Sequence, residues 1–397
     1  MPLTIQSTQT TAITMASDYQ GDPKDFALVI PVPTVVKQDD IHVVDQAVLD
    51  RLDSYSEPRL VEYTDYDPCL GEGLEEVMVT ARRREEAQSD KPAPVKVEAR
   101  YSVEEYEIVI LSAEQSDGLQ SWLTDNGYKM PAGAGDVLAS YIKQKMHFFV
   151  AKIDLTRMKL AGRNFIRPLQ VRYASPKFML PLRLGTVNAD GPQDLILMAL
   201  TQHGRVETTN YQTERVPSDI YVPLFIQSRF VDFYRTLFDR AVAKSGGTSV
   251  FLEYAWNTGW CDPCSAPPPT PADLSTFGAN WGVTRSDGYN YYPSGPFLTR
   301  LHVRYDRAHF PEDLMLNETK DDDNFQARYV MHHLWTGEAK CDRAAKYKDT
   351  VADRGRKELD QVADLTGWSR DMIKAEMKQS GEPAEYRRHL FDWLFND

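Results

Sequence analysis

Two of the four cysteines of this 397-residue chain lie close together, in the stretch EYAWNTGWCDPCSAPPPTP. Cys261 and Cys264 have the Cys-x-x-Cys spacing found in redox dithiols, in halves of zinc sites and in disulfides that close a tight loop. A redox pair needs a helix N-terminus or a nearby cation to stabilise its thiolate. Here several prolines follow, which cannot continue a helix, and Asp262 opposes thiolate formation. The residues therefore favour a structural role, with thiol redox catalysis as the alternative.

A structural zinc ion would need two further ligands beside this pair. Cys69 with Cys341, or His332 with His333, are the candidates, but their spacings match no zinc ribbon or zinc finger. Four cysteines also allow three disulfide pairings, which the residues alone do not separate. No nucleophile elbow, phosphate loop or dinucleotide fingerprint occurs, so no cofactor is indicated. Without such a motif, His302 is expected to be a packed histidine rather than a catalytic base.

The composition restricts the classes of partner. A hydrophobic content of 42% and a charged content of 26% are typical of a folded soluble protein. The formal net charge of -13 argues against a surface that binds nucleic acid or anionic lipid. No stretch approaches the about 18 consecutive apolar residues of a membrane helix. The first residues also lack the features of a signal peptide, so the protein stays in the cytoplasm or its leader is absent from this chain.

The hydrophobic pattern predicts an α+β fold, with mostly antiparallel sheets, interspersed helices and a helical C-terminal region. The clearest helix covers residues 225–247. Its apolar stripe has members three or four residues apart: Ile226, Phe230, Phe233, Tyr234, Leu237 and Ala241. Ser112 and Gln115 have the spacing of a capping box that starts another helix, and Gly127 suits its left-handed end. A strand is expected over residues 177–184.

Changes in composition suggest four regions. Residues 71–95 are rich in charge and end in a Lys-Pro-Ala-Pro run, which is typical of a linker or insertion. This segment separates an N-terminal part of the α+β domain, residues 1–70, from the main α+β region, residues 96–348. A C-terminal helical region covers residues 349–397.

One short segment within the linker could bind a partner. Residues 74–86, LEEVMVTARRREE, resemble the TonB-box region of Gram-negative outer-membrane receptors, an extended segment that pairs with its partner by strand addition. The resemblance implies that Val77, Met78, Val79 and Thr80 would form the donated strand. The alternative is an ordinary edge strand followed by a basic turn.

Several longer stretches together resemble a bacterial family known as domain of unknown function 2330. The resemblance runs from about the start of the chain to at least Cys341. Its stretches, in chain order, are DFALVIPVP, EYEIVILSA, LQSWLTDNGYKMPAGA, FMLPLRLG, NYQTERVPSD, EYAW, CDPC, LTRLHVRY and FPEDL. The family brings no activity, substrate or catalytic residue. Its members resemble exported proteins, which implies a compartment where disulfides persist.

Export changes the interpretation of the cysteines. It favours a Cys261–Cys264 disulfide that closes a tight loop, and a Cys69–Cys341 disulfide that ties the start of the insertion to the C-terminal part. We therefore expect a periplasmic or extracellular protein, or a cytoplasmic one if Met1 is the true start. The expected role is non-enzymatic, in binding or in the structure of the envelope. The alternatives are a thiol oxidoreductase that uses Cys261 and Cys264, and donation of residues 74–86 to a TonB-like partner.

Overall fold

The computed structural model describes residues 2–7, 10–16, 27–69, 96–128, 130–160, 165–187, 189, 191–259, 266–279, 281, 295–337, 341 and 343–382. The chain divides into two compact units. Unit 1 comprises Met1–Glu57, Thr80–Glu214 and Gly246–Gln326, and unit 2 comprises Pro58–Val79, Arg215–Ser245 and Ala327–Asp397. Helices accompany mostly antiparallel sheets, so the predicted α+β class is confirmed. The expected charged insertion, residues 71–95, lies outside the described residues.

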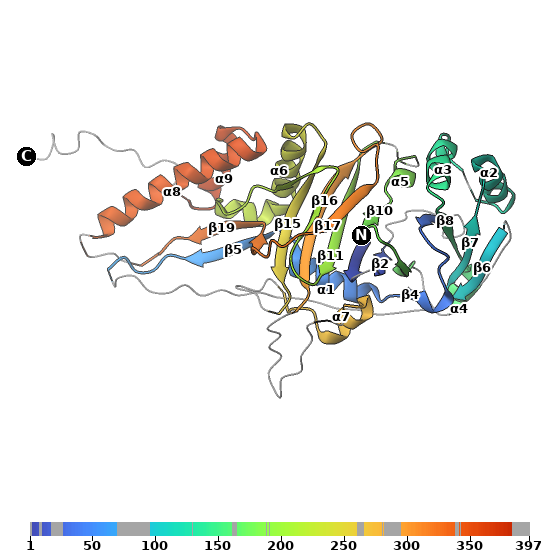
Figure 1. Cartoon of the computed structure of the whole chain (residues 1–397). Helices are drawn as coiled ribbons and strands as arrows, with labels where there is room; N and C mark the ends of the chain where they lie inside the picture. Colours follow the sequence, from blue (N-terminus) through green and yellow to red (C-terminus); the bar gives the residue numbers. More distant parts are fainter. Residues whose placement is uncertain are drawn as a thin grey trace, which may run out of the picture. The chain divides into compact units, whose positions relative to one another are not determined.

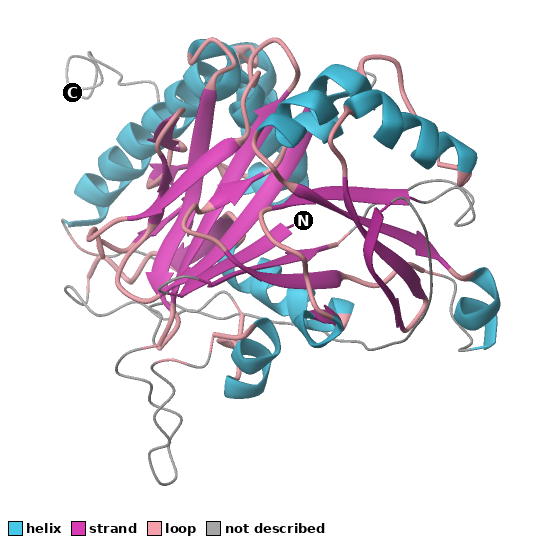
Figure 2. Cartoon of the chain, turned by 45° about the vertical axis from the view of Figure 1, so that its right-hand side comes forward, coloured by secondary structure: helices cyan, strands magenta, loops and turns pink. Residues whose placement is uncertain are grey.

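A nine-stranded sheet dominates unit 1, and Figures 1 and 2 show its long twisted strands. Its strands, in spatial order, are β13 (Gln212–Arg215), β15 (Ser249–Asn257), β16 (Phe297–Tyr305), β11 (Gln193–Thr201), β1 (Pro2–Ser7), β2 (Thr10–Met15), β9 (Leu169–Ala174) and β4 (Ile41–Val43), with β18 (Phe325–Gln326) on β15. β1 runs parallel to β11, whereas β2 and β16 run antiparallel to their neighbours.

Helix α1 (Gln46–Ser56) packs on this sheet because its apolar side chains fall on one stripe. Asp45 caps its first turn by accepting a hydrogen bond from the amide of Ala47. The stripe shares a core with β11, β15 and β16, formed by residues that include Val48, Leu49, Leu52, Tyr55, Met198, Leu200, Tyr254 and Leu298. Helix α7 (Pro271–Phe277) adds Leu274 and Phe277 to the same core.

A second sheet of unit 1 has the order β3 (Ala27–Val32), β8 (His147–Ile153), β7 (Tyr106–Ser112) and β6 (Lys96–Val103). Helices α2 (Ser116–Asp125) and α3 (Ala134–Lys143) contribute to its apolar core, together with Phe148 and Val150 of β8. Unit 1 also contains η2 (Gln38–Asp40), α4 (Leu155–Leu160), α5 (Arg183–Val187) and the three-stranded sheet β10 (Met179–Leu180), β17 (Leu314–Glu318) and β12 (Val206–Thr208).

Unit 2 is built around a parallel sheet in the order β14 (Ile220–Tyr221), β19 (Arg328–His333) and β5 (Arg59–Thr64). Its helical elements are η3 (Leu224–Arg229), α6 (Phe230–Lys244), α8 (Arg343–Thr366) and α9 (Arg370–Gln379). The predicted stripe of α6 supplies Phe233, which packs edge-on against Tyr329 and against Trp368. Among the described helices, none combines the length and the apolar character needed to cross a bilayer.

Two local predictions are wrong. Ser112 does not cap a helix: it ends β7 and donates a hydrogen bond to Glu98 on the neighbouring strand, while α2 begins later with Gln115 at its N-cap and no side-chain cap. The strand expected over residues 177–184 is two residues long and gives way to α5. The carboxylate of Asp313 accepts hydrogen bonds from the amides of Leu182 and Arg183, which satisfies the start of that short helix.

Buried ion pairs hold the second sheet to the segment before β9. Arg167 is fully buried and its guanidinium bonds the carboxylates of Glu104 and Glu105 in the β6–β7 turn. Tyr106 donates its hydroxyl to the carbonyl of Arg167. Charges at this depth are tolerated because each has its counter-charge.

We predict that Arg167→Met lowers the free energy of unfolding of unit 1 by about 3–5 kcal/mol, since two buried carboxylates lose their partner. Urea unfolding followed by tryptophan fluorescence measures it. The matched control is Arg157→Met, which removes a partly exposed ion pair with Asp154 and should cost at most about 1 kcal/mol. Equal effects of the two substitutions would contradict the assignment.

Candidate functional site

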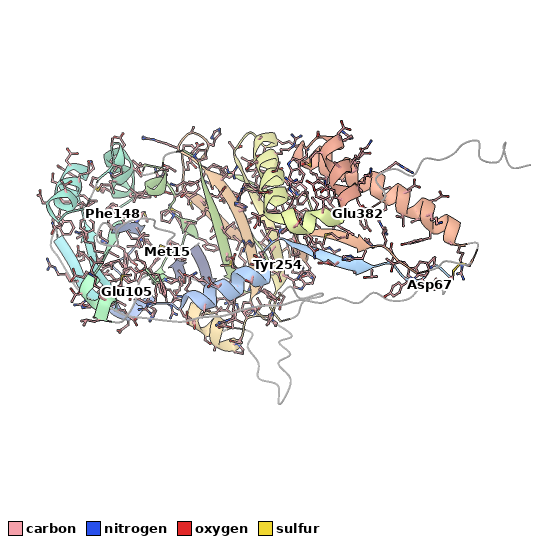
Figure 3. The ribbon with its side chains drawn as sticks, turned by 180° about the vertical axis from the view of Figure 1, so that it is seen from behind. Met15, Asp67, Glu105, Phe148, Tyr254 and Glu382 are labelled. Carbon is pink, nitrogen blue, oxygen red and sulfur yellow. A yellow bond between two sulfur atoms is a disulfide. The ribbon has the colours of Figure 1, made fainter. Side chains whose placement is uncertain are left out.

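Unit 1 contains a cavity of about 1040 Å³, a volume that suits ligand binding. Its wall combines strands of both large sheets with helix and loop residues, and most of the side chains are apolar (Met15, one of them, is labelled in Figure 3). The lining residues are Ile13, Met15, Ala16, Leu28, Val29, Ile30, Gln46, Phe165, Ile166, Leu180, Pro181, Leu182, Leu184, Gly185, Gln193, Asp194, Leu195, Ile196 and Tyr305. We take this cavity as the candidate binding site.

Two strands from different sheets contribute to the cavity wall. Residues 193–196 of β11 pair with β16 in the nine-stranded sheet. Leu28, Val29 and Ile30 belong to β3, which among the described strands pairs with β8 and forms the outer strand of the second sheet. Both large sheets of unit 1 therefore border the same apolar space.

One end of the cavity is polar. Tyr305 donates its hydroxyl to the side-chain carbonyl of Gln193, with 2.7 Å between the oxygens. Asp194 accepts two hydrogen bonds from the guanidinium of Arg304, each 2.8 Å long. Burial opposes ionisation of Asp194, but the hydrogen bonds from His302 and Arg304 outweigh it and hold the pKa of that carboxyl well below its usual range.

His302 connects this end to the sheet interior. Its Nδ1 lies 2.8 Å from a carboxylate oxygen of Glu253, and its Nε2 lies 3.5 Å from one of Asp194. Burial disfavours the imidazolium, but the two carboxylates outweigh it, so the pKa of His302 is raised. An imidazole with both nitrogens directed at carboxylates has the surroundings of a packed histidine, as the sequence suggested.

Arg300 completes the cluster. Its Nε lies 2.7 Å from the second carboxylate oxygen of Glu253, and its Nη1 bonds Asp53 of α1. Glu253 is 1% exposed, so the charges of Arg300 and His302 are what make its burial tolerable. The ion pairs of this cluster thus connect α1, β15, β16 and the start of β11 with one another.

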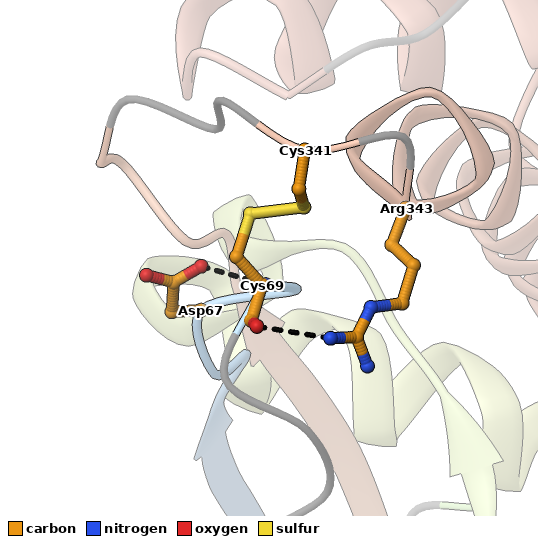
Figure 4. Close-up of a disulfide and its surroundings, with 4 residues drawn as sticks. All are labelled: Asp67, Cys69, Cys341 and Arg343. Carbon is orange, nitrogen blue, oxygen red and sulfur yellow. Dashed lines mark hydrogen bonds between the residues drawn. A yellow bond between two sulfur atoms is a disulfide. The ribbon is translucent and has the colours of Figure 1, made fainter.

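The cysteines of unit 2 form a disulfide. Cys69 and Cys341 are bonded, with 5.9 Å between their Cα atoms (Figure 4). Asp67 accepts a hydrogen bond from the amide of Cys69, and Arg343 donates a hydrogen bond to the carbonyl of Cys69. The bonded sulfurs are not available as zinc ligands.

The histidines of the zinc alternative are also engaged elsewhere. His332 contacts Asp65 and His333 contacts Glu62. Within the described ranges, no group of His, Cys, Asp and Glu is arranged to hold a metal ion. The remaining predicted site residues, Cys261 and Cys264, lie outside the described residues.

The predicted partner-binding segment is likewise beyond what the structure describes. Val77, Met78, Val79 and Thr80 all lie outside the described residues, so strand donation by residues 74–86 stays a prediction.

A second charged cluster, in unit 2, was missed by sequence reasoning. Asp65 accepts hydrogen bonds from both terminal nitrogens of Arg354, at 2.9 and 2.6 Å, and from the hydroxyl of Tyr347. Glu358, one turn after Arg354, has a carboxylate oxygen 3.7 Å from the Nε of that arginine and is 5% exposed. The four-residue spacing of Arg354 and Glu358 is compatible with an ion pair on a helix, but no signal in the sequence shows that the carboxyl is buried.

Two carboxyls of this cluster share a raised pKa. Burial, reinforced by Glu382, raises the pKa of Glu358 to about 7. Burial also raises the pKa of Glu382 to about 7, although one of its oxygens accepts a hydrogen bond from the amide of Leu224. In the folded unit, both carboxyls therefore change charge near neutral pH. The free energy of unfolding of unit 2 depends on pH in this range as a result.

We predict that unit 2 loses stability as the pH rises from about 5 to 8. Both carboxyls ionise in the unfolded chain near their ordinary pKa of 4.5 but in the folded unit only near 7, so folding opposes ionisation across that window. Glu358→Gln imitates the neutral form and should raise the free energy of unfolding at pH 8 by about 1–3 kcal/mol. Urea unfolding at pH 5, 6, 7 and 8, followed by circular dichroism, measures the slope.

The control for this prediction is Asp371→Asn, which removes an exposed carboxylate of α9 and should leave the slope unchanged. A wild-type unit that gains stability over this pH range, or a Glu358→Gln variant with the wild-type slope, would contradict the prediction.

The comparisons with known proteins concern mainly unit 1. The sequence profile of a family described as "Uncharacterized protein conserved in bacteria (DUF2330)" matches residues 4–317, which include every residue that lines the cavity. No curated protein and no solved structure matches the chain. The match extends over more than half of the 397 residues, so the chain belongs to this family of uncharacterized bacterial proteins.

Proposed function

We propose that the protein is a non-enzymatic binding protein of the bacterial cell envelope, and that its ligand occupies the cavity of unit 1. The observation that carries the proposal is the apolar cavity of about 1040 Å³, which lies wholly within the residues matched by the family. Burial of apolar surface contributes about 25 cal/mol per Å², so a ligand that covers this wall gains affinity without any charged contact.

The charged groups near the cavity support binding rather than catalysis. Asp194, Glu253 and His302 are bonded to one another or to arginines. The lowered pKa of Asp194 and the raised pKa of His302 both reflect surroundings that favour the charged form. A general base is more effective when its pKa lies near the working pH and its proton acceptor faces a substrate. Here the ring nitrogens of His302 face carboxylates instead.

The disulfide of unit 2 supports the location in the envelope. Structural disulfides persist in oxidising compartments and are rare in the bacterial cytoplasm. Cys69–Cys341 closes a loop of 272 residues along the sequence, which in the chain-entropy model stabilises the fold by about 5–6 kcal/mol. A thiol oxidoreductase at Cys261 and Cys264 and strand donation by residues 74–86 stay predictions from the sequence alone.

Binding is tested with the fluorescent apolar probe 1-N-phenylnaphthylamine. We expect saturable enhancement of its fluorescence by the wild-type chain, and a loss of affinity of about tenfold or more for Leu28→Arg, which places a charge in the cavity wall. The matched control is Leu160→Arg, the same change at a side chain that is 83% exposed, which should bind as the wild type does. Equal binding by all three proteins would exclude the cavity as the site.

The compartment is tested by counting thiols. Protein isolated from its own bacterium without reductant, then denatured, should show no free thiol, because an oxidising compartment preserves both expected disulfides. Mass spectrometry after alkylation makes the count and identifies any labelled cysteine. Four labelled cysteines would contradict a location outside the cytoplasm.

A further inference from the structure

Helix α5 and the residues just before it supply a distinct part of the cavity wall. The wall residues of this segment are Leu180, Pro181, Leu182, Leu184 and Gly185. A helix of five residues gains little stability from its own hydrogen bonds. The position of α5 is therefore set by contacts with other parts of unit 1.

The carboxylate of Asp313 provides these contacts. Its Oδ1 accepts hydrogen bonds from the amides of Leu182 and Arg183, at 2.9 and 3.2 Å, and from the hydroxyl of Tyr141, at 2.6 Å. Its Oδ2 accepts two more from the guanidinium of Arg183, at 3.1 and 2.9 Å. The same guanidinium lies over the ring of Tyr141, 4.6 Å from the ring centroid. One carboxylate with five donors thus joins α5 to α3 and to the start of β17.

Asp313 is itself held in place. It is 6% exposed and Tyr141 is fully buried, so bonds to this charged group form in surroundings where water competes little. The side-chain amide of Asn210 donates to the carbonyl of Asp313, with a distance of 2.8 Å. The side-chain carbonyl of Asn210 accepts from the amide of Met315, at 3.0 Å. These bonds make Asp313 a fixed anchor for α5.

The segment held by Asp313 extends to the polar end of the cavity. Gly185 passes so close to Tyr305 that a Cβ atom on this glycine would lie 3.1 Å from the tyrosine hydroxyl. That hydroxyl donates to the side chain of Gln193. A shift of α5 would therefore change the apolar wall at Leu184 and also the space beside Tyr305.

We infer that Asp313 is the positioning residue of the cavity: through α5 it fixes the shape of the wall and thereby controls which apolar ligands bind. This inference rests on the proposed binding function and adds the residue that controls selectivity. A wall held in one position favours a rigid ligand, which loses little conformational freedom on binding, over a flexible chain. Loosening α5 weakens binding of the rigid ligand more, because a flexible chain adapts to a changed wall.

The test compares a rigid and a flexible ligand on the full chain. The rigid ligand is 1-N-phenylnaphthylamine, and the flexible one is n-dodecanol, measured by its displacement of that probe. Asp313→Asn puts an amide group in place of a carboxylate beside the guanidinium of Arg183. We expect this variant to bind the rigid probe about tenfold more weakly and dodecanol at most about threefold more weakly. Tyr141→Phe removes one hydrogen bond to Asp313 and should change the ratio of the two affinities in the same direction by a smaller factor.

The ratio of the two affinities separates positioning from a general loss of stability. A partly unfolded variant loses affinity for both ligands by the same factor, so its ratio equals that of the wild type. The matched control is Glu318→Gln, the same change of carboxylate to amide at the other end of β17. Glu318 also accepts hydrogen bonds from two main-chain amides, those of Gln202 and His203, but it does not line the cavity. This control should keep the wild-type ratio.

The outcomes separate this inference from the binding function. If the wild type binds the probe but Asp313→Asn and Tyr141→Phe keep its ratio, or if Glu318→Gln changes the ratio as much, the inference fails while the binding function stands. If Asp313→Asn does not fold, the ratio of Tyr141→Phe decides. If the wild type binds neither ligand, the binding function fails and this inference fails with it.

Discussion

The pairing of β11 with β16 is the interaction on which the cavity wall depends. The nine residues of β11 pair with β16 without a break, from Gln193 with Tyr305 to Thr201 with Phe297. Residues 193–196 of this strand also line the cavity, so the wall there is part of a continuous strand pair. A preformed wall of this kind reduces the conformational entropy that must be lost on binding.

Ion pairs between side chains also hold β11 in position. Asp194 is on β11, Glu253 on β15, and His302 and Arg300 on β16, so each ion pair crosses between strands. The pKa of Arg300 is raised although burial opposes its charge, because Glu253 and Asp53 more than compensate. Removing one member would leave its partner buried without a counter-charge, which makes the cluster a structural support.

The sequence predicted what depends on local periodicity. The stripe that includes Phe233 and Leu237 identified α6, and Gly127 indeed has a positive φ of 78° after α2. Predictions failed where a distant residue decides the local structure. Asp313 accepts hydrogen bonds from the amides at the start of α5, although it lies 130 residues further along the chain. Ser112 donates a hydrogen bond to Glu98 on the paired strand instead of capping a helix. The candidate site could not be predicted from the sequence for the same reason. Its wall is formed by separate segments between residues 13 and 305, and no sequence motif connects them.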